Sequence, residues 1–177
     1  MDMKAELTHQ FRWEDLGDLE KGRPNLGPST LVAVYRLMQY TMREVLKNNF
    51  GKEAACRVFV EAGAIAGEEF CKNVLNTKLE FNEFVADLQE KLKTLGIGVL
   101  RIEKANLETM DFTLTVEEDL DCSGLPVLGE TVCDYDEGFI AGILRAYTGM
   151  LFDVKEVDCW ATGERTCRFV AKPKKKA

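Results

Sequence analysis

Apolar side chains recur at helical spacing through the first half of the chain, which predicts three amphipathic helices. The first follows a predicted cap at Ser29 or Thr30 and ends near Gly51. Its apolar face is expected to hold Leu31, Val34, Tyr35, Met38, Met42, Val45 and Leu46. The second, from about 52 to 75, is expected to bury Ala55, Val58, Phe59, Ala62, Ala66 and Phe70. The third, from about 81 to 95, carries a stripe of Phe84, Val85, Leu88 and Leu92.

From residue 98 onward the apolar residues alternate, as they do in strands with one buried face. The predicted strands cover 98–104, 110–116, 151–160 and 165–171, and a short strand is also expected at 8–13. A fourth helix runs from near Thr131 to Tyr147, with Gly149 just past its end as a cap. Three helices, a hairpin, a helix and a hairpin predict an α+β fold, with an antiparallel sheet packed against helices.

The length of 177 residues fits one domain, expected over 1–171 and followed by a Lys-rich tail at 172–177. No apolar stretch approaches the roughly 20 residues of a membrane span. No signal peptide is visible after Met1, so a cytoplasmic location is expected. The net charge is −7, although the tail itself is basic. The acidic body is therefore not expected to bind nucleic acid.

Two helical segments share a pattern of small residues. Residues 63–67 of the second helix read Gly-Ala-Ile-Ala-Gly, and residues 138–142 of the fourth read Gly-Phe-Ile-Ala-Gly. Glycines four apart lie on one face of a helix and let another backbone approach closely. The pattern fits a thin cavity wall, a tight helix crossing at a subunit interface, or helix packing in the core.

Six cysteines accompany a single histidine, His9, which argues against histidine-based catalysis. Cys56 and Cys71 lie in the second helix and are expected to be packing residues. The other four lie in the last third of the chain: Cys122, Cys133, Cys159 and Cys167. Spacing alone leaves three explanations open for these four, namely a metal site, unpaired packing thiols or a redox disulfide.

Two segments around these cysteines resemble the 4-vinyl reductase domain. Residues 133–142 have a cysteine leading a Gly-rich helix, and residues 154–169 have Glu-x-x-Cys, a glycine and Cys-x-Phe. The resemblance covers about 120–171 well, and the loop at 22–27 is also similar. It implies a ligand-binding domain of the NO-signalling and Golgi-transport type. That fold is shared by the sensor domains of phenol- and xylene-responsive activators and by TRAPP vesicle-tethering subunits.

The resemblance also implies a zinc ion held by three cysteines and a glutamate. The matching positions here are Cys133, Glu156, Cys159 and Cys167. Cys122 is an extra thiol that could replace Glu156 as the fourth ligand, and an all-thiolate site would also admit iron. Four protein ligands leave no open position, so such a site is structural.

The expected function is a zinc-containing domain that binds or senses a small hydrophobic or aromatic molecule and acts through a partner. The candidate ligand-binding residues are Phe59, Phe84, Phe112, Phe139 and Trp160. Two alternatives are a vinyl reductase or accessory factor acting on a tetrapyrrole, and an assembly or tethering module. No catalytic residues are identified, and the acidic run at 117–121 is expected to be a solvated turn. The N-terminal helices are expected to form a homodimer.

Overall fold

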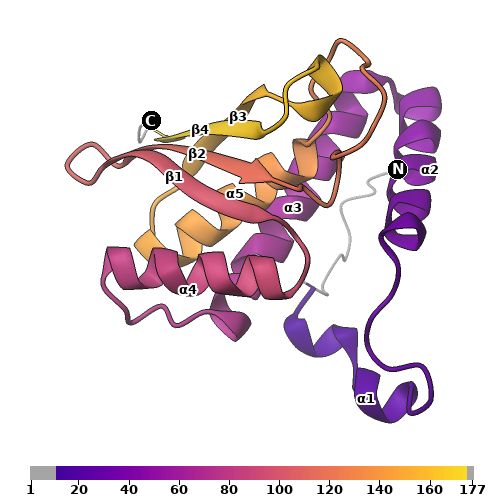
Figure 1. Ribbon diagram of the computed structural model, residues 1–177, viewed down its shortest axis with the longest axis horizontal. Coiled ribbons are helices and arrows are strands. Elements are labelled where there is room, and N and C mark those ends of the chain that lie inside the picture. The colour runs from indigo at the N-terminus through magenta and orange to yellow at the C-terminus, as the bar shows by residue number, and fades with distance from the viewer. Residues whose placement is uncertain (1–10, 175–177) are drawn as a thin grey trace, which may run out of the picture.

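The computed structural model describes residues 11–174 (Figure 1). Its helices are α1 (Leu19–Gly22), α2 (Val32–Phe50), α3 (Lys52–Val74), α4 (Phe81–Thr94) and α5 (Asp134–Thr148). Its strands are β1 (Val99–Asn106), β2 (Asp111–Glu117), β3 (Phe152–Asp158) and β4 (Cys167–Pro173). Short 3-10 helices cover Trp13–Leu16 and Trp160–Thr162. The predicted α+β class is confirmed, because four antiparallel strands pair in the order β1-β2-β4-β3.

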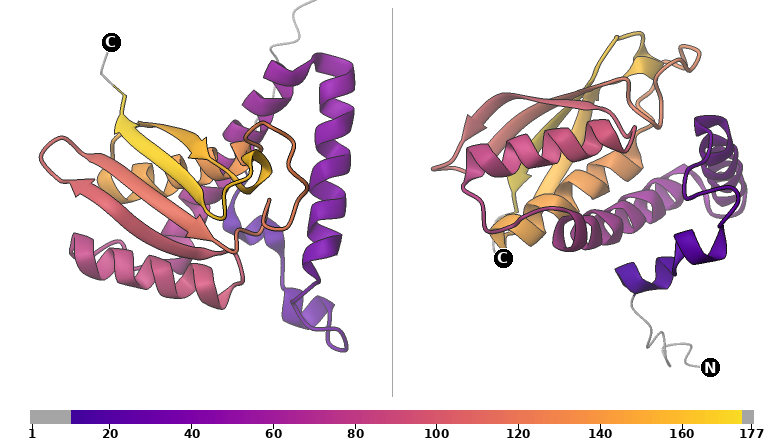
Figure 2. Two further views of the ribbon diagram at one scale, coloured as in Figure 1. Left: turned by 45° about the horizontal axis from the view of Figure 1, so that its top comes forward. Right: turned by 60° about the horizontal axis from the view of Figure 1, so that its bottom comes forward.

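The helices lie in layers beneath the sheet (Figures 1 and 2). Helices α4 and α5 are the nearest to the strands, α3 packs on the other side of α5, and α2 packs on α3. The core joins the sheet to the first layer, with Phe169, Phe112 and Leu114 among its buried side chains. Beyond α3, helix α2 stands at the edge of the molecule (Figure 1).

The repeated glycine pattern joins α3 to α5. A Cβ atom built on Gly63 would lie 2.0 Å from the carbonyl oxygen of Tyr135, and one on Gly138 would lie 2.0 Å from that of Val60. Gly67 and Gly142 make equivalent approaches to the opposite backbone. The two glycine pairs therefore belong to a tight crossing within the chain, which is the core-packing explanation of the pattern.

Helix α2 differs from a typical core-facing helix. Its apolar stripe is exposed, with Met38 59% and Met42 51% accessible, whereas its buried residues are the polar Gln39 and Arg43. The helix therefore turns its polar side toward the protein and its apolar side outward. This arrangement leaves the apolar face of α2 without a partner among residues 11–174.

Two expectations for the N-terminal half are wrong in detail. Val58 is 45% accessible and Ala62 is also exposed, because α3 turns its glycine face, rather than these residues, toward α5. Phe11 and Arg12 form no strand, and Trp13 begins a 3-10 helix. The rest of the predicted strand at 8–13, including His9, lies outside the described residues.

The C-terminal strand extends into the predicted tail. Lys172 pairs with Asp153 across the β3–β4 ladder, and the backbone N–H of Lys174 donates to the carbonyl oxygen of Leu151 at 2.7 Å. The last three tail residues, 175–177, lie outside the described part of the chain. Among residues 11–174, every helix is too short or too polar to cross a lipid bilayer.

A candidate metal centre beside an apolar cavity

Four buried cysteines from separate segments converge at one end of the sheet. The Sγ atoms of Cys122, Cys133, Cys159 and Cys167 all lie within 4.8 Å of one another. The Sγ of Cys122 lies 3.1 Å from that of Cys167, and the Sγ of Cys133 lies 3.9 Å from that of Cys159. Four thiolates around tetrahedral zinc would be about 3.8 Å apart, given Zn–S bonds of about 2.3 Å. The cluster therefore has the donor set and the size that such a metal ion needs.

The segment that carries the first two thiols, residues 119–134, is referred to below as the cysteine loop. Asp119 shapes its start, because its Oδ1 accepts hydrogen bonds from the backbone N–H groups of Asp121 and Cys122, both at 2.9 Å. Further along, the carbonyl oxygen of Ala161 accepts from the N–H groups of Leu128 and Gly129. These contacts hold the cysteine loop against the β3–β4 connection, which carries Cys159.

Glu156 lies beside the thiol cluster but is not one of its four members. Its Oε2 accepts a hydrogen bond from the backbone N–H of Cys133 at 3.0 Å, and its Oε1 is buried without a hydrogen-bond partner among the described residues. Burial, together with the nearby Cys159, raises the pKa of Glu156 to about 8. The structure therefore brings Cys122 into the cluster, whereas Glu156 contacts the backbone at the start of α5.

The acidic run at 117–121 is not the solvated turn that the sequence suggested. Asp119 is 4% accessible and Asp121 is 2% accessible. Asp121 accepts hydrogen bonds from the Tyr35 hydroxyl at 2.8 Å and from the Gln39 amide, while the Tyr40 hydroxyl donates to its carbonyl oxygen at 3.0 Å. Polar groups on α2 thus replace the water that the run would otherwise need.

Two arginines complete the contact between α2 and the cysteine loop. Arg36 donates to the carbonyl oxygens of Leu120 and Asp119 at 2.7 and 3.2 Å. Arg43 donates to the Asp134 carboxylate at 2.6 Å and to the Val132 carbonyl oxygen at 2.8 Å. The seat of α2 is therefore largely the same loop that supplies two of the four thiols.

An apolar cavity of about 60 Å³ lies between α4, α5 and the sheet. Three of the five candidate ligand-binding residues, Phe84, Phe112 and Phe139, line it. The Phe84 ring stacks on Tyr147 with centroids 3.9 Å apart, which closes the α4 side. Asp119 and Asp136 also line the cavity, so that it adjoins the residues around the thiol cluster.

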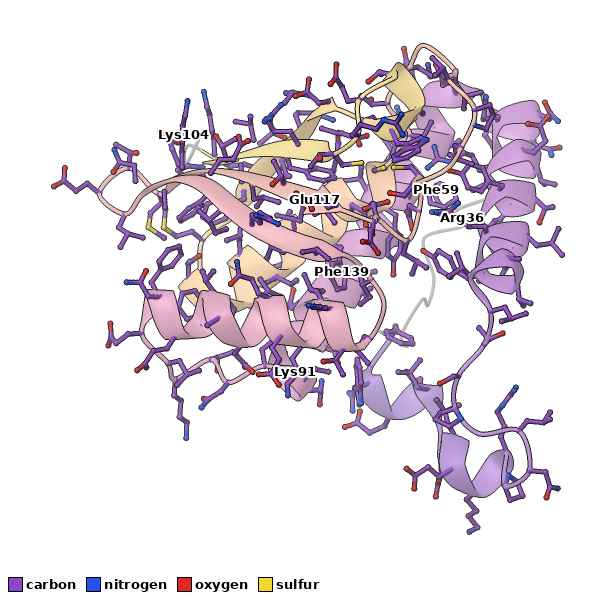
Figure 3. All side chains as sticks on the ribbon, viewed as in Figure 1. Arg36, Phe59, Lys91, Lys104, Glu117 and Phe139 are labelled. Carbon is purple, nitrogen blue, oxygen red and sulfur yellow. The ribbon has the colours of Figure 1, made fainter. Side chains whose placement is uncertain are left out.

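The other two candidate ligand-binding residues lie elsewhere. Phe59 lies toward α2, well apart from Phe139 (Figure 3), and the Arg43 guanidinium lies 4.3 Å from its ring centroid. Trp160 lies in the β3–β4 connection and donates from Nε1 to the Leu125 carbonyl oxygen at 2.9 Å. The structure therefore does not bring these two rings to the cavity.

Sequence reasoning missed Asp119, Asp136 and the polar face of α2. A signal was present, because Gln39 and Arg43 are four residues apart within an otherwise apolar helix. Such a stripe indicates a polar partner, although it does not reveal which segment supplies that partner.

Known proteins share this fold. An uncharacterized protein of Methanocaldococcus jannaschii, MJ0150, is 26% identical over 96% of this chain and 93% of its own length. The phenol-responsive sensory domain of the transcription activator PoxR, solved with phenol, has a TM-score of 0.64 at 16% identity. That comparison covers 81% of this chain and 75% of the sensory domain.

Two further solved structures are similar at low sequence identity. A vinyl-4-reductase family protein from M. jannaschii has a TM-score of 0.61 at 14% identity, covering 96% of this chain and 99% of its own. Subunit 3 of a trafficking protein particle complex from Naegleria fowleri, covalently bound to palmitic acid, has a TM-score of 0.64 at 11% identity. Coverage there is 81% of this chain and 95% of the subunit. These likenesses confirm the predicted fold.

The match to a family model falls on the cysteine-bearing half of the chain. Residues 112–173 match the model of the 4-vinyl reductase domain, and they contain all four clustered cysteines and the glycines of α5. The resemblance drawn from the cysteine and glycine motif is thereby confirmed: the C-terminal part of this chain is a 4-vinyl reductase domain.

Proposed function

We propose that this protein is a sensor domain that binds a small hydrophobic or aromatic molecule in the cavity between α4, α5 and the sheet. The observation that carries the proposal is the apolar cavity that adjoins the thiol cluster, with three aromatic rings in its wall. The fold that this chain shares with a phenol-responsive sensory domain supports it. Binding would be passed on through a partner protein.

The four clustered cysteines would hold one zinc ion. An all-thiolate set of four closes the coordination sphere, so the metal would fasten the cysteine loop and α5 to the C-terminal hairpin. Glu156 would orient Cys133 through the hydrogen bond to its backbone N–H, in the manner of a group behind a metal ligand. Iron would suit the same thiolates, and metal analysis distinguishes the two.

Ligand entry would require a movement of α4. The cavity of about 60 Å³ is smaller than the engineered apolar cavity of about 150 Å³ that admits benzene. Only a few polar contacts tie α4 down, such as the bond from Gln89 Nε2 to the Leu100 carbonyl oxygen at 3.1 Å. Helix α4 would therefore act as the lid, and the Phe84–Tyr147 stack would separate when it opens.

The exposed face of α2 would pair with the same face of a second copy. Met38 and Met42 line an apolar groove between α2 and α3, and a self-complementary apolar face is what a two-fold dimer requires. Light scattering should show a dimer that Met38→Glu converts to a monomer, while Leu107→Glu on the exposed β1–β2 turn leaves it intact. A wild-type monomer, or binding of α2 to a different protein, would contradict this assignment.

Calorimetry with toluene and phenol on metal-loaded protein tests the ligand site. Ile143→Phe would fill the cavity from α5 and should abolish binding, whereas Val157→Phe, exposed on β3, should leave it unchanged. Circular dichroism would show that both variants are folded. Equal binding by the two variants, or no binding by the wild-type protein, would refute the site.

A further inference from the structure

The cavity has one acidic end. Its wall is almost wholly apolar, except where Asp119 and Asp136 reach it from the cysteine loop and from α5. The carboxylate oxygens of these two residues and the Sγ of Cys133 lie within 4.8 Å of one another. A purely apolar guest would leave this end of the cavity without a matching group.

Asp136 has an acceptor that the protein does not satisfy. Its Oδ2 is buried and has no hydrogen-bond partner among residues 11–174. A carboxylate offers about four acceptor positions on its two oxygens. Asp119 uses its Oδ1 for two backbone N–H groups, so it has no donor to offer Asp136 in its ionised form.

The cationic side chains near this end are committed elsewhere. Arg43 pairs with Asp134, Lys155 pairs with Glu137, and Arg36 donates to backbone carbonyl groups of the cysteine loop. On α4, Lys91 lies on the side away from the sheet (Figure 3). Buried carboxylates normally have a cation or strong donors beside them. The described part of the protein supplies neither to Asp136.

We propose that the ligand of this cavity has an apolar body and an ammonium end, and that the ammonium lies against Asp136 and Asp119. The inference rests on the proposed function, since it assigns a ligand class to the same cavity. Phe84, Phe112 and Phe139 would surround the apolar body, and the carboxylate pair would accept from the ammonium N–H groups. An amine would thereby supply the positive charge that the surrounding side chains do not.

Three probes with the same ring and different ends test the inference. Calorimetry on metal-loaded full-length protein would compare benzylamine, benzyl alcohol and toluene. Benzylamine is expected to bind at least tenfold more tightly than toluene, with benzyl alcohol between them. Asp136→Leu should remove this preference, whereas Asp153→Leu, on the exposed face of β3, should retain it.

A second variant covers the case in which Asp136→Leu does not fold. Asp136→Asn keeps an acceptor oxygen and removes the charge, so it should weaken benzylamine binding about tenfold while changing benzyl alcohol binding little. Equal affinities for the three probes would overturn the ammonium assignment and leave the proposed cavity intact. Failure of every probe to bind would instead refute the proposed function itself.

Metal analysis closes the remaining route. Asp119, Asp136 and Cys133 also form a group that could hold a second metal ion. The inference predicts one metal per chain and the same count in Asp136→Asn. Two ions per chain, or loss of an ion from that variant, would overturn the inference, because Asp136 would then be a metal ligand.

Discussion

Replacing Gly138 by alanine tests whether the α3–α5 crossing depends on direct contact between backbones. The added Cβ would lie 2.0 Å from the Val60 carbonyl oxygen and 2.8 Å from the Ala64 nitrogen. Ordinary van der Waals contact begins near 3.4 Å, so the helices would have to separate locally by about 1.4 Å. Both opposing atoms belong to a helical backbone and cannot rotate away.

The magnitude follows from two opposing effects. Overpacking a core typically costs about 1–3 kcal/mol, and a clash against backbone belongs at the upper end of that range. Alanine returns about 1 kcal/mol through its higher helix propensity. The net loss of unfolding free energy is therefore about 2 kcal/mol, which lowers the Tm of a domain of this size by about 4–8 °C.

Thermal and urea unfolding monitored by circular dichroism would measure this loss. Gly22→Ala is the matched control, because Gly22 is also a helical glycine, has no atom within 4 Å of the added Cβ, and should change stability by less than about 0.5 kcal/mol. A Gly138→Ala protein as stable as the wild type would refute the reasoning. It would mean that the two helices can separate without cost.

Three further predictions concern the thiol cluster and the seat of α2. Cys122→Ser should lower zinc content measured by mass spectrometry, whereas Glu156→Gln should keep one ion per chain; the reverse result would make Glu156 the fourth ligand. Iodoacetamide at pH 8 should label Cys56, which is half-buried, before Cys71, because complete burial raises the pKa of Cys71 to about 11; equal rates would contradict this. Arg43→Ala should cost about 3 kcal/mol in urea unfolding, since it leaves the mostly buried Asp134 partner unpaired. A change below about 1 kcal/mol would show that the pair is solvated.

The sequence predicts the C-terminal half of this fold better than the N-terminal half. Alternation in 98–104 and 110–116 places the β1–β2 hairpin, and Gly149 marks the end of α5 with a left-handed conformation at φ 75°. These signals are local. The same is true of the stripe of Phe84, Leu88 and Leu92, all of which are buried.

The misjudged positions depend on long-range contacts. Asp119 and Asp121 have the composition of a solvated turn, and only the docking of a helix about 80 residues earlier in the chain buries them. The apolar stripe of α2 has the period of a core helix, yet its polar residues face the protein. Periodicity identifies a helix and its two faces, but it does not say which face meets the body of the protein.

The seat of α2 makes the position of this helix depend on the state of the cysteine loop. Tyr35, Arg36 and Arg43 all bind groups within residues 119–134, and Cys122 and Cys133 belong to the same segment. Assembly of the thiol centre would thus come before correct placement of α2, in folding and in any later exchange of metal. A chemical event at four buried sulfur atoms would in this way be readable on the outer surface, as the presence or absence of one ordered helix.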